Sequence, residues 1–174
     1  MPATAASVVF PATNTSVTIR KANTDDCEAM LRMVHALAEY QGVDNRVSAS
    51  AAELRRAGFG ATPQFEALIA ERFGAPVGLA MFQTNYSIWE GASSLQITDL
   101  FVDEAVRGTG VGFHLVQEVA RIARDRGCKG LQLNMVHANP SRSSLDRIGF
   151  VHQDDLLHYR LDAPALKKLV EMER

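Results

Sequence analysis

The stretch Arg107-Gly108-Thr109-Gly110-Val111-Gly112 has the composition of a phosphate-binding loop. Alternating glycines let a backbone turn sharply and approach a ligand without side-chain collision. A predicted helix follows, and its first N–H groups have no intrahelical partner and lie at the positive end of the helix dipole, where a pyrophosphate can bind. Phe113 and His114 then depart from both the dinucleotide fingerprint and the Walker A loop. A plain glycine-rich turn stays open as the alternative interpretation of this stretch alone.

Other segments accompany this loop in a recognisable order: Gly58-Phe59-Gly60, 86–91 (YSIWEG), 97–102 (ITDLFV) and 159–162 (YRLD). Together with the Arg-x-x-Gly-x-Gly pattern they resemble the GNAT acetyltransferase superfamily, in its diamine (spermidine/spermine) acetyltransferase branch. The resemblance covers Val17 to the C-terminus. It implies the GNAT form of an α/β fold, a mixed, mostly antiparallel central sheet with helices on both faces. It also implies acetyl-CoA as donor, a small-molecule primary amine as acceptor, and a homodimer.

The same resemblance assigns residues to the donor. A bulged strand segment of the family, whose backbone binds the pantetheine arm and holds the thioester oxygen, matches Leu100, Phe101 and Val102. The remaining residues predicted to contact the cofactor are Arg107, Gly108, Thr109, Gly110, Val111, Gly112, Phe113 and Asn139.

On the acceptor side, a group must take a proton from the amine, because an ammonium has no lone pair for attack. Asp99 is the predicted proton relay or amine anchor, with a hydrogen-bonded strand-end carboxylate as the alternative. Trp89, Glu39 and Tyr40 are predicted to border the acceptor; for the last two the alternative is a solvated helix end. Several positions that are acidic or aromatic in polyamine-acetylating relatives differ here: Gln41, Asn45, Ser87, Thr98 and Leu156. The acceptor amine therefore stays unidentified.

Leu145 stands where many relatives have a tyrosine that can protonate the leaving sulfur. We expect Leu145 to be a core side chain, so that the thiolate leaves unassisted or Ser143, Ser144 or Tyr159 substitutes. This departure leaves two functions open: an active N-acetyltransferase, and a CoA-binding sensor or regulatory module with little or no turnover. A third, a scaffold whose glycine loop is only a turn, applies if CoA does not bind.

The elements that must position these residues follow from hydrophobic periodicity. Apolar alternation predicts strands over 17–20, 65–73, 77–85, 94–102, 131–135 and 150–161. In the fourth of these it puts Leu95 and Ile97 on one face and extends to Asp99. Helical spacing and capping signals, including Thr24, a Ser50–Glu53 capping box and Asn139, predict helices over 24–42, 50–57, 108–126, 140–149 and 164–171. The turn Gly74-Ala75-Pro76 predicts a hairpin.

Composition indicates the number of domains and the classes of partner that the protein is not expected to bind. The chain has 174 residues, 47% hydrophobic and 22% charged, with a formal net charge of −2. These values fit one globular domain, residues 17–174 after a mobile tail at 1–16, and argue against a nucleic-acid partner. With no long apolar run and no basic leader, we expect no membrane association and a cytoplasmic location. The two cysteines and five scattered histidines have no metal-ligand spacing, so no metal is predicted.

Overall fold

The computed structural model describes residues 8–10, 17–43, 46–136, 139 and 141–172. They divide into a large unit, Met1–Asn139, and a small C-terminal unit, Pro140–Arg174. Most of the predicted tail, and Asn45 among the acceptor-side positions, fall outside the described residues. Within the tail, however, Val8–Phe10 form a strand, β1, that the sequence did not predict.

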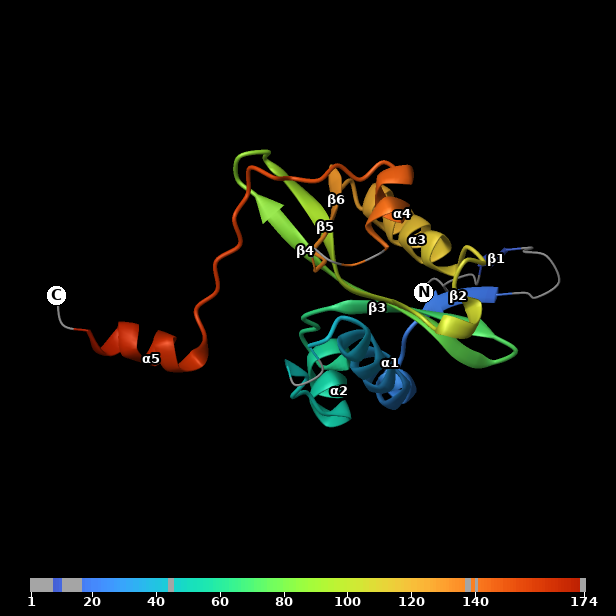
Figure 1. Cartoon of the computed structure of the whole chain (residues 1–174), viewed down its shortest axis with the longest axis horizontal. Coiled ribbons are helices and arrows are strands. Elements are labelled where there is room, and N and C mark those ends of the chain that lie inside the picture. The colour runs from blue at the N-terminus through green and yellow to red at the C-terminus, as the bar shows by residue number, and fades with distance from the viewer. Residues whose placement is uncertain (1–7, 11–16, 44–45, 137–138, 140, 173–174) are drawn as a thin grey trace. The chain divides into compact units, whose positions relative to one another are not determined.

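A six-stranded sheet in the order β1-β2-β3-β4-β5-β6 forms the centre of the large unit (Figure 1). All neighbouring strands are antiparallel except β5 and β6, which are parallel. This confirms the predicted mixed, mostly antiparallel sheet. After β1, its strands are β2 (Val17–Lys21), β3 (Glu66–Arg72), β4 (Ala75–Ser87), β5 (Ala92–Val102) and β6 (Gly130–Leu133).

Helices cover both faces of this sheet, as predicted. On one face lie α1 (Cys27–Tyr40) and α2 (Ala51–Phe59), and Met30 and Met33 of α1 pack there against a cluster that includes Leu79 and Met81 of β4. On the other face lies α3 (Val111–Asp125) (Figure 1). Gly78 of β4 points to that side, because a Cβ built on it would lie 3.1 Å from Leu115 and 3.2 Å from Val111. Alternate residues of β4 thus serve opposite faces.

Two helix starts illustrate what local signals can decide. The predicted capping box at α2 is confirmed: the Glu53 N–H donates to the Ser50 hydroxyl at 3.2 Å, and the Ser50 N–H to the Glu53 carboxylate at 2.8 Å. The predicted Thr24 cap is wrong. Thr24–Asp26 form a 3-10 turn, η1, before α1, and Asn23 caps it by accepting from the Asp25 N–H at 2.8 Å. Asparagine and threonine are both good caps, so composition alone cannot choose between neighbours.

The β3–β4 connection lies one residue earlier than predicted. Phe73 and Gly74 have φ angles of +53° and +76°. Positive φ at both central residues is the requirement of a type I′ turn, which matches the twist of a two-residue hairpin. Ala75 and Pro76 therefore belong to β4 rather than to the turn.

The small unit contains α4 (Arg142–Arg147) and α5 (Ala163–Glu171). The helix predicted over 164–171 is confirmed, and the Asp162 carboxylate caps it by accepting from the Ala165 N–H at 2.9 Å. Asn139 does not cap α4, since Ser141 occupies the N-cap position. The strand predicted over 150–161 is wrong, because these residues form no strand in the structure. No helix in the described part of the chain is long and apolar enough to cross a bilayer.

Candidate active site

The glycine loop connects the end of β5, through the 3-10 turn η3 (Glu104–Val106), to the start of α3. Gly108 and Gly110 have φ angles of +78° and +93°, in the left-handed region that side chains disfavour. These two turns explain why α3 begins at Val111 and not, as predicted, at residue 108. Gly112 serves a different purpose: a Cβ there would lie 3.4 Å from Val102 Cγ2, so its absence allows α3 to approach β5 closely.

The first turn of α3 carries backbone N–H groups suited to an anion. The first helical hydrogen bond runs from the His114 N–H to the Gly110 carbonyl at 3.0 Å. The N–H groups of Val111, Gly112 and Phe113 precede it, and Gly110 has no side chain to cap them. Together with the helix dipole they form the kind of site that binds phosphate. The loop therefore fits the pyrophosphate of CoA.

Beside the loop, the edge of β5 is open. β5 pairs in parallel with β6 only over Ser94–Ile97, which lie beside Gly130–Leu133. Beyond Ile97, β5 has no strand partner on that side among the described residues, while Leu100, Phe101 and Val102 remain paired with β4 on the other. Backbone N–H and C=O groups at such an edge are available to an extended ligand. This is the setting that the resemblance assigned to the pantetheine arm.

A β-bulge in β5 orients Asp99. Met81 pairs with Asp99 but Phe82 with Ile97, so Thr98 is an extra residue. An extra residue shifts the alternation by one, so every later side chain of that strand lies on the opposite face from the one that simple alternation predicts. Asp99 therefore lies on the face of Met81, which α1 covers, and the prediction that it shares a face with Leu95 and Ile97 is wrong. The bulge lies before the Leu100–Val102 segment to which the resemblance assigned it.

The surroundings of Asp99 make its carboxyl less acidic. Burial raises the pKa of Asp99, and a hydrogen bond with the Thr98 side chain partly opposes this. The same hydroxyl lies 3.3 Å from the Met81 carbonyl oxygen, so its single hydrogen is donated either to that carbonyl or to the Asp99 carboxylate. No ion pair joins Asp99 to any residue that the structure describes. A half-buried carboxylate with a raised pKa is a better proton acceptor than an exposed one.

Tyr40 lies on the glycine loop. It is the last residue of α1, and the Arg107 guanidinium carbon lies 4.4 Å from the centre of its ring. The Arg107 Nε–H donates to the Val102 carbonyl at 3.0 Å. Glu39, next to Tyr40, is exposed. The sequence carried no signal for the Tyr40–Arg107 pair, because the two residues come from distant segments that only the fold brings together.

Trp89 and Asp99 of one chain lie far apart. It lies in the β4–β5 connection and is 100% exposed. From Ala92 to Asp99, β5 runs beside six steps of β4, from Ser87 to Met81, which at about 3.3 Å each separates Ala92 from Asp99 by roughly 20 Å. One chain alone therefore does not form a pocket that contains both side chains.

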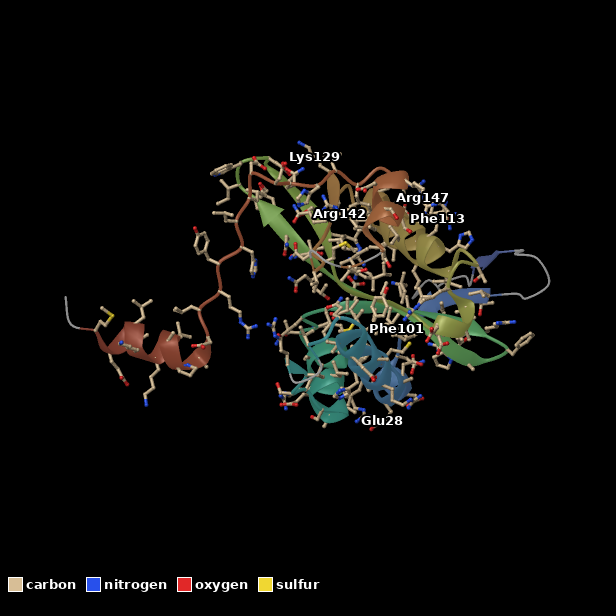
Figure 2. All side chains as sticks on the ribbon, viewed as in Figure 1. Glu28, Phe101, Phe113, Lys129, Arg142 and Arg147 are labelled. Carbon is tan, nitrogen blue, oxygen red and sulfur yellow. The ribbon has the colours of Figure 1, made fainter. Side chains whose placement is uncertain are left out.

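The other predicted contacts are distributed over both units. Phe101 is buried in the cluster against α1, whereas Phe113 is half-exposed at the start of α3; Figure 2 labels both. Asn139 is the last residue of the large unit. Leu145 is half-buried in α4 of the small unit, where no described residue is fully buried, so the structure does not bear out the expectation of a core side chain. Among the described residues, no three potential metal ligands gather in one place.

Comparison with known proteins agrees with this geometry. Residues 31–150 match the acetyltransferase (GNAT) family. Thialysine N-epsilon-acetyltransferase from Bos taurus is 32% identical over 167 residues, covering 88% of this chain and 96% of that protein. Spermidine/spermine N(1)-acetyltransferase-like protein 1 from Homo sapiens is 32% identical over 142 residues, 74% of this chain and 20% of that protein. A solved V. cholerae integron cassette protein shares the fold, with a TM-score of 0.74 at 21% identity over 90% of this chain and 98% of that one. The chain thus belongs to the GNAT family of acetyltransferases.

Proposed function

We propose that this protein transfers the acetyl group of acetyl-CoA to a primary amine of a small molecule, in a ternary complex. The observation that carries the proposal is the combination of an uncapped α3 N-terminus after the glycine loop with the open edge of β5. The two features meet at Val102 and Gly112, where α3 approaches β5. An anion site next to a free strand edge suits a donor that is a pyrophosphate followed by an amide-containing arm.

In the proposed reaction, the amine nitrogen attacks the thioester carbon, the carbon–sulfur bond breaks, and CoA leaves as its thiolate. Asp99 takes the proton that the nitrogen loses, directly or through water. Its burial and lack of an ion-pair partner in the described chain support this role, because both keep the carboxylate basic. A backbone N–H of the Leu100–Val102 segment holds the oxygen on which negative charge develops.

For the acceptor, we propose the amine of a lysine-like amino acid in preference to a polyamine. A polycation is best held by several carboxylates. The bulge residue beside Asp99 is the uncharged Thr98, and Ser87, at the distant end of β4, is also uncharged. The similarity to thialysine N-epsilon-acetyltransferase over 88% of the chain supports the same choice.

We also propose a homodimer. Trp89 lies too far from Asp99 to share its pocket, so a role for Trp89 at the acceptor requires a second copy of the chain. Tyr159 and other apolar side chains of the C-terminal segment are exposed and offer a surface for that copy. The cytoplasmic location stays a prediction from the sequence.

The alternative, a CoA-binding module with little turnover, rests on Leu145 in place of the acid tyrosine. A thiol has an ordinary pKa of about 8.5, so its thiolate can leave without an acid. We therefore expect Leu145 to slow the reaction without preventing it.

One assay separates the two functions. Free-thiol release from acetyl-CoA is measured with thialysine, lysine, spermidine, spermine and an aminoglycoside, alongside calorimetric binding of CoA. Amine-dependent release that is fastest with thialysine or lysine supports the proposal. CoA binding without release with any amine would establish the module instead, and no CoA binding at all would contradict both.

A further inference from the structure

The Tyr40 ring and the Val102 carbonyl hold the Arg107 guanidinium from two directions. The guanidinium carbon lies over the face of the ring, 4.4 Å from the ring centre. The carbonyl accepts the Nε–H at 3.0 Å. We infer that Tyr40 is a positioning residue for donor binding, which presents the remaining Arg107 N–H groups to the phosphates of acetyl-CoA. This inference rests on the proposed function and names a part of the same site.

The directions of these contacts support the inference. A guanidinium is planar, and its N–H donors point outward within its plane. The ring contact is at the central carbon, and the Nε bond to the Val102 carbonyl fixes the direction in which the remaining donors point. Neither Nη1 nor Nη2 has a hydrogen bond or ion pair with the part of the chain that the structure describes. Arg107 directly precedes Gly108, so the side chain starts from the first residue of the glycine loop.

Orienting the Arg107 side chain before the donor binds should increase the affinity for the donor. An arginine side chain loses rotational entropy when it is immobilised. If Tyr40 already immobilises it, phosphate binding does not bear that cost again. The hydroxyl group of Tyr40 has no part in this arrangement, because the contact is made by the face of the ring. Tyr40 therefore contributes to donor affinity, although the sequence placed it on the acceptor side.

The first experiment compares Tyr40→Leu with Tyr40→Phe. Tyr40→Leu removes the aromatic face and should raise the KM for acetyl-CoA roughly threefold to tenfold, while Tyr40→Phe keeps the stack and the wild-type KM. The KM for S-acetylpantetheine, which lacks phosphates, should be the same in all three proteins, as should the KM for the amine. Phe73→Leu is a matched control, since it removes another arginine stack, that of Arg72, with 5.3 Å between guanidinium and ring centre; it should change neither donor KM.

A double-mutant cycle tests the route through Arg107. CoA affinity is measured by calorimetry, which needs no turnover, in Tyr40→Leu, Arg107→Leu and the double variant. Because Tyr40 acts through Arg107, Tyr40→Leu should weaken binding no further once Arg107 is leucine. Additive losses, or an equal rise in the KM for acetylpantetheine, would overturn the inference and leave Tyr40 a lining or structural residue. Wild-type turnover decides the proposed function separately, so the two can fail independently.

Discussion

Asp99 is the residue on which the proposed chemistry depends most. Asp99→Asn keeps the size of the side chain and removes its capacity to accept a proton. We expect kcat/KM for the amine to fall roughly 10²-fold, the usual contribution of general base catalysis, with CoA affinity retained. Steady-state kinetics and calorimetry on the same preparation measure both. Asp103→Asn, which removes a charge from the 3-10 turn after β5, is the control and should lose far less. Full activity of Asp99→Asn on every accepted amine would remove Asp99 from the mechanism.

Thr98 tunes the same carboxyl. When its hydroxyl donates to the Asp99 carboxylate in place of the Met81 carbonyl, it lowers the pKa of Asp99 and so opposes the effect of burial. Thr98→Val keeps the shape and removes the hydroxyl, so the pKa of Asp99 should rise further. Because the base acts when deprotonated, the acidic limb of the profile of kcat/KM against pH should move to higher pH. Thr98→Ser keeps the hydroxyl and should leave the limb in place; a limb that is identical in all three proteins would contradict the assignment of that limb to Asp99.

Among the elements, the glycine loop leads to a prediction about CoA affinity. Gly110→Asp adds a side chain at a φ of +93° and a negative charge beside the α3 N–H groups. Repulsion of the pyrophosphate should weaken CoA binding at least about tenfold, or about 1.4 kcal/mol, by calorimetry. Gly127→Asp, at a φ of +71° beyond the other end of α3, carries the same charge and backbone strain and controls for stability. Equal CoA affinity in the two folded variants would show that the phosphate binds elsewhere.

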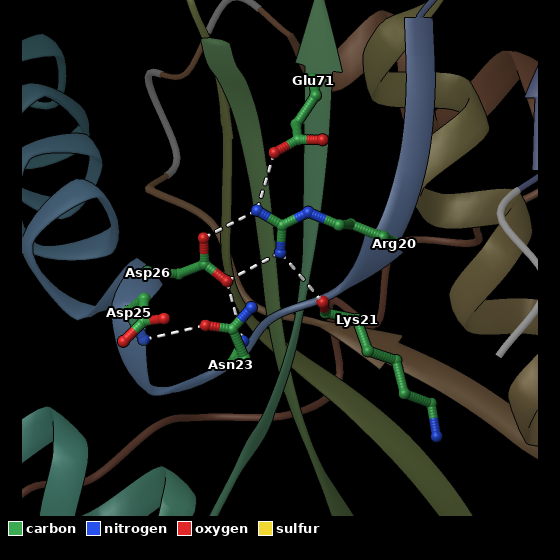
Figure 3. A network of polar contacts seen from close by, with 6 residues as sticks. All are labelled: Arg20, Lys21, Asn23, Asp25, Asp26 and Glu71. Carbon is green, nitrogen blue, oxygen red and sulfur yellow. Dashed lines mark hydrogen bonds and ion pairs between the residues drawn. The ribbon is translucent and has the colours of Figure 1, made fainter. Parts of the chain in front are cut away.

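A network at the start of η1 predicts how the fold responds to acid (Figure 3). Arg20 of β2 binds the buried Asp26 carboxylate through two bonds of 2.7 and 2.8 Å, and Glu71 of β3 at 2.7 Å. Arg20 holds the pKa of Asp26 below its ordinary value. The carboxylate therefore stabilises the fold above the unfolded pKa of about 3.9, and this contribution is lost as the pH falls through the lower folded pKa.

Asp26→Asn should accordingly lower the free energy of unfolding by about 2–3 kcal/mol at pH 7, because it breaks a largely buried pair while Glu71 still pairs with Arg20. Urea denaturation at pH 7 and at pH 2.5 measures the loss, which should shrink at the lower pH. Asp25→Asn, at the adjacent exposed position, is the control and should be nearly neutral. A loss for Asp26→Asn that is independent of pH would mean that packing, rather than charge, is what the carboxylate contributes.

The same elements show how far the sequence alone could predict this molecule. The Ser50–Glu53 cap, the long amphipathic α3 and the glycine loop were predictable because each depends on residues close together in the chain. The Thr98 bulge was not, since an extra residue is defined only by the register of the partner strand. The pairing of Tyr40 with Arg107 likewise depends on tertiary contact. The strand predicted at 150–161 failed for a related reason: alternating apolar residues indicate a strand only if another strand edge pairs with them.

For the whole molecule, the exposed C-terminal segment predicts association. Val151, Leu156, Leu157 and Tyr159 are all exposed in the small unit, and this many exposed apolar side chains in one short segment offer a surface to a partner. We expect light scattering to show a dimer at micromolar concentration. Leu156→Glu combined with Tyr159→Glu should make the chain monomeric, because two charges on each copy would have to be buried. Gln153→Glu, an exposed polar position in the same segment, should remain dimeric.

Trp89 provides an independent readout of the same association, because it is the only tryptophan of the chain and is fully exposed in one copy. If the second copy brings Trp89 to the acceptor site, its fluorescence should be blue-shifted in the dimer and shift to the red in the double glutamate variant. That variant should also lose activity on the amine while CoA binding, which the proposal places within a single copy of the chain, persists. A wild-type monomer with full amine turnover would refute the dimer and would exclude Trp89 from the acceptor site, since about 20 Å of strand separates the β4–β5 connection from Asp99 in the same chain.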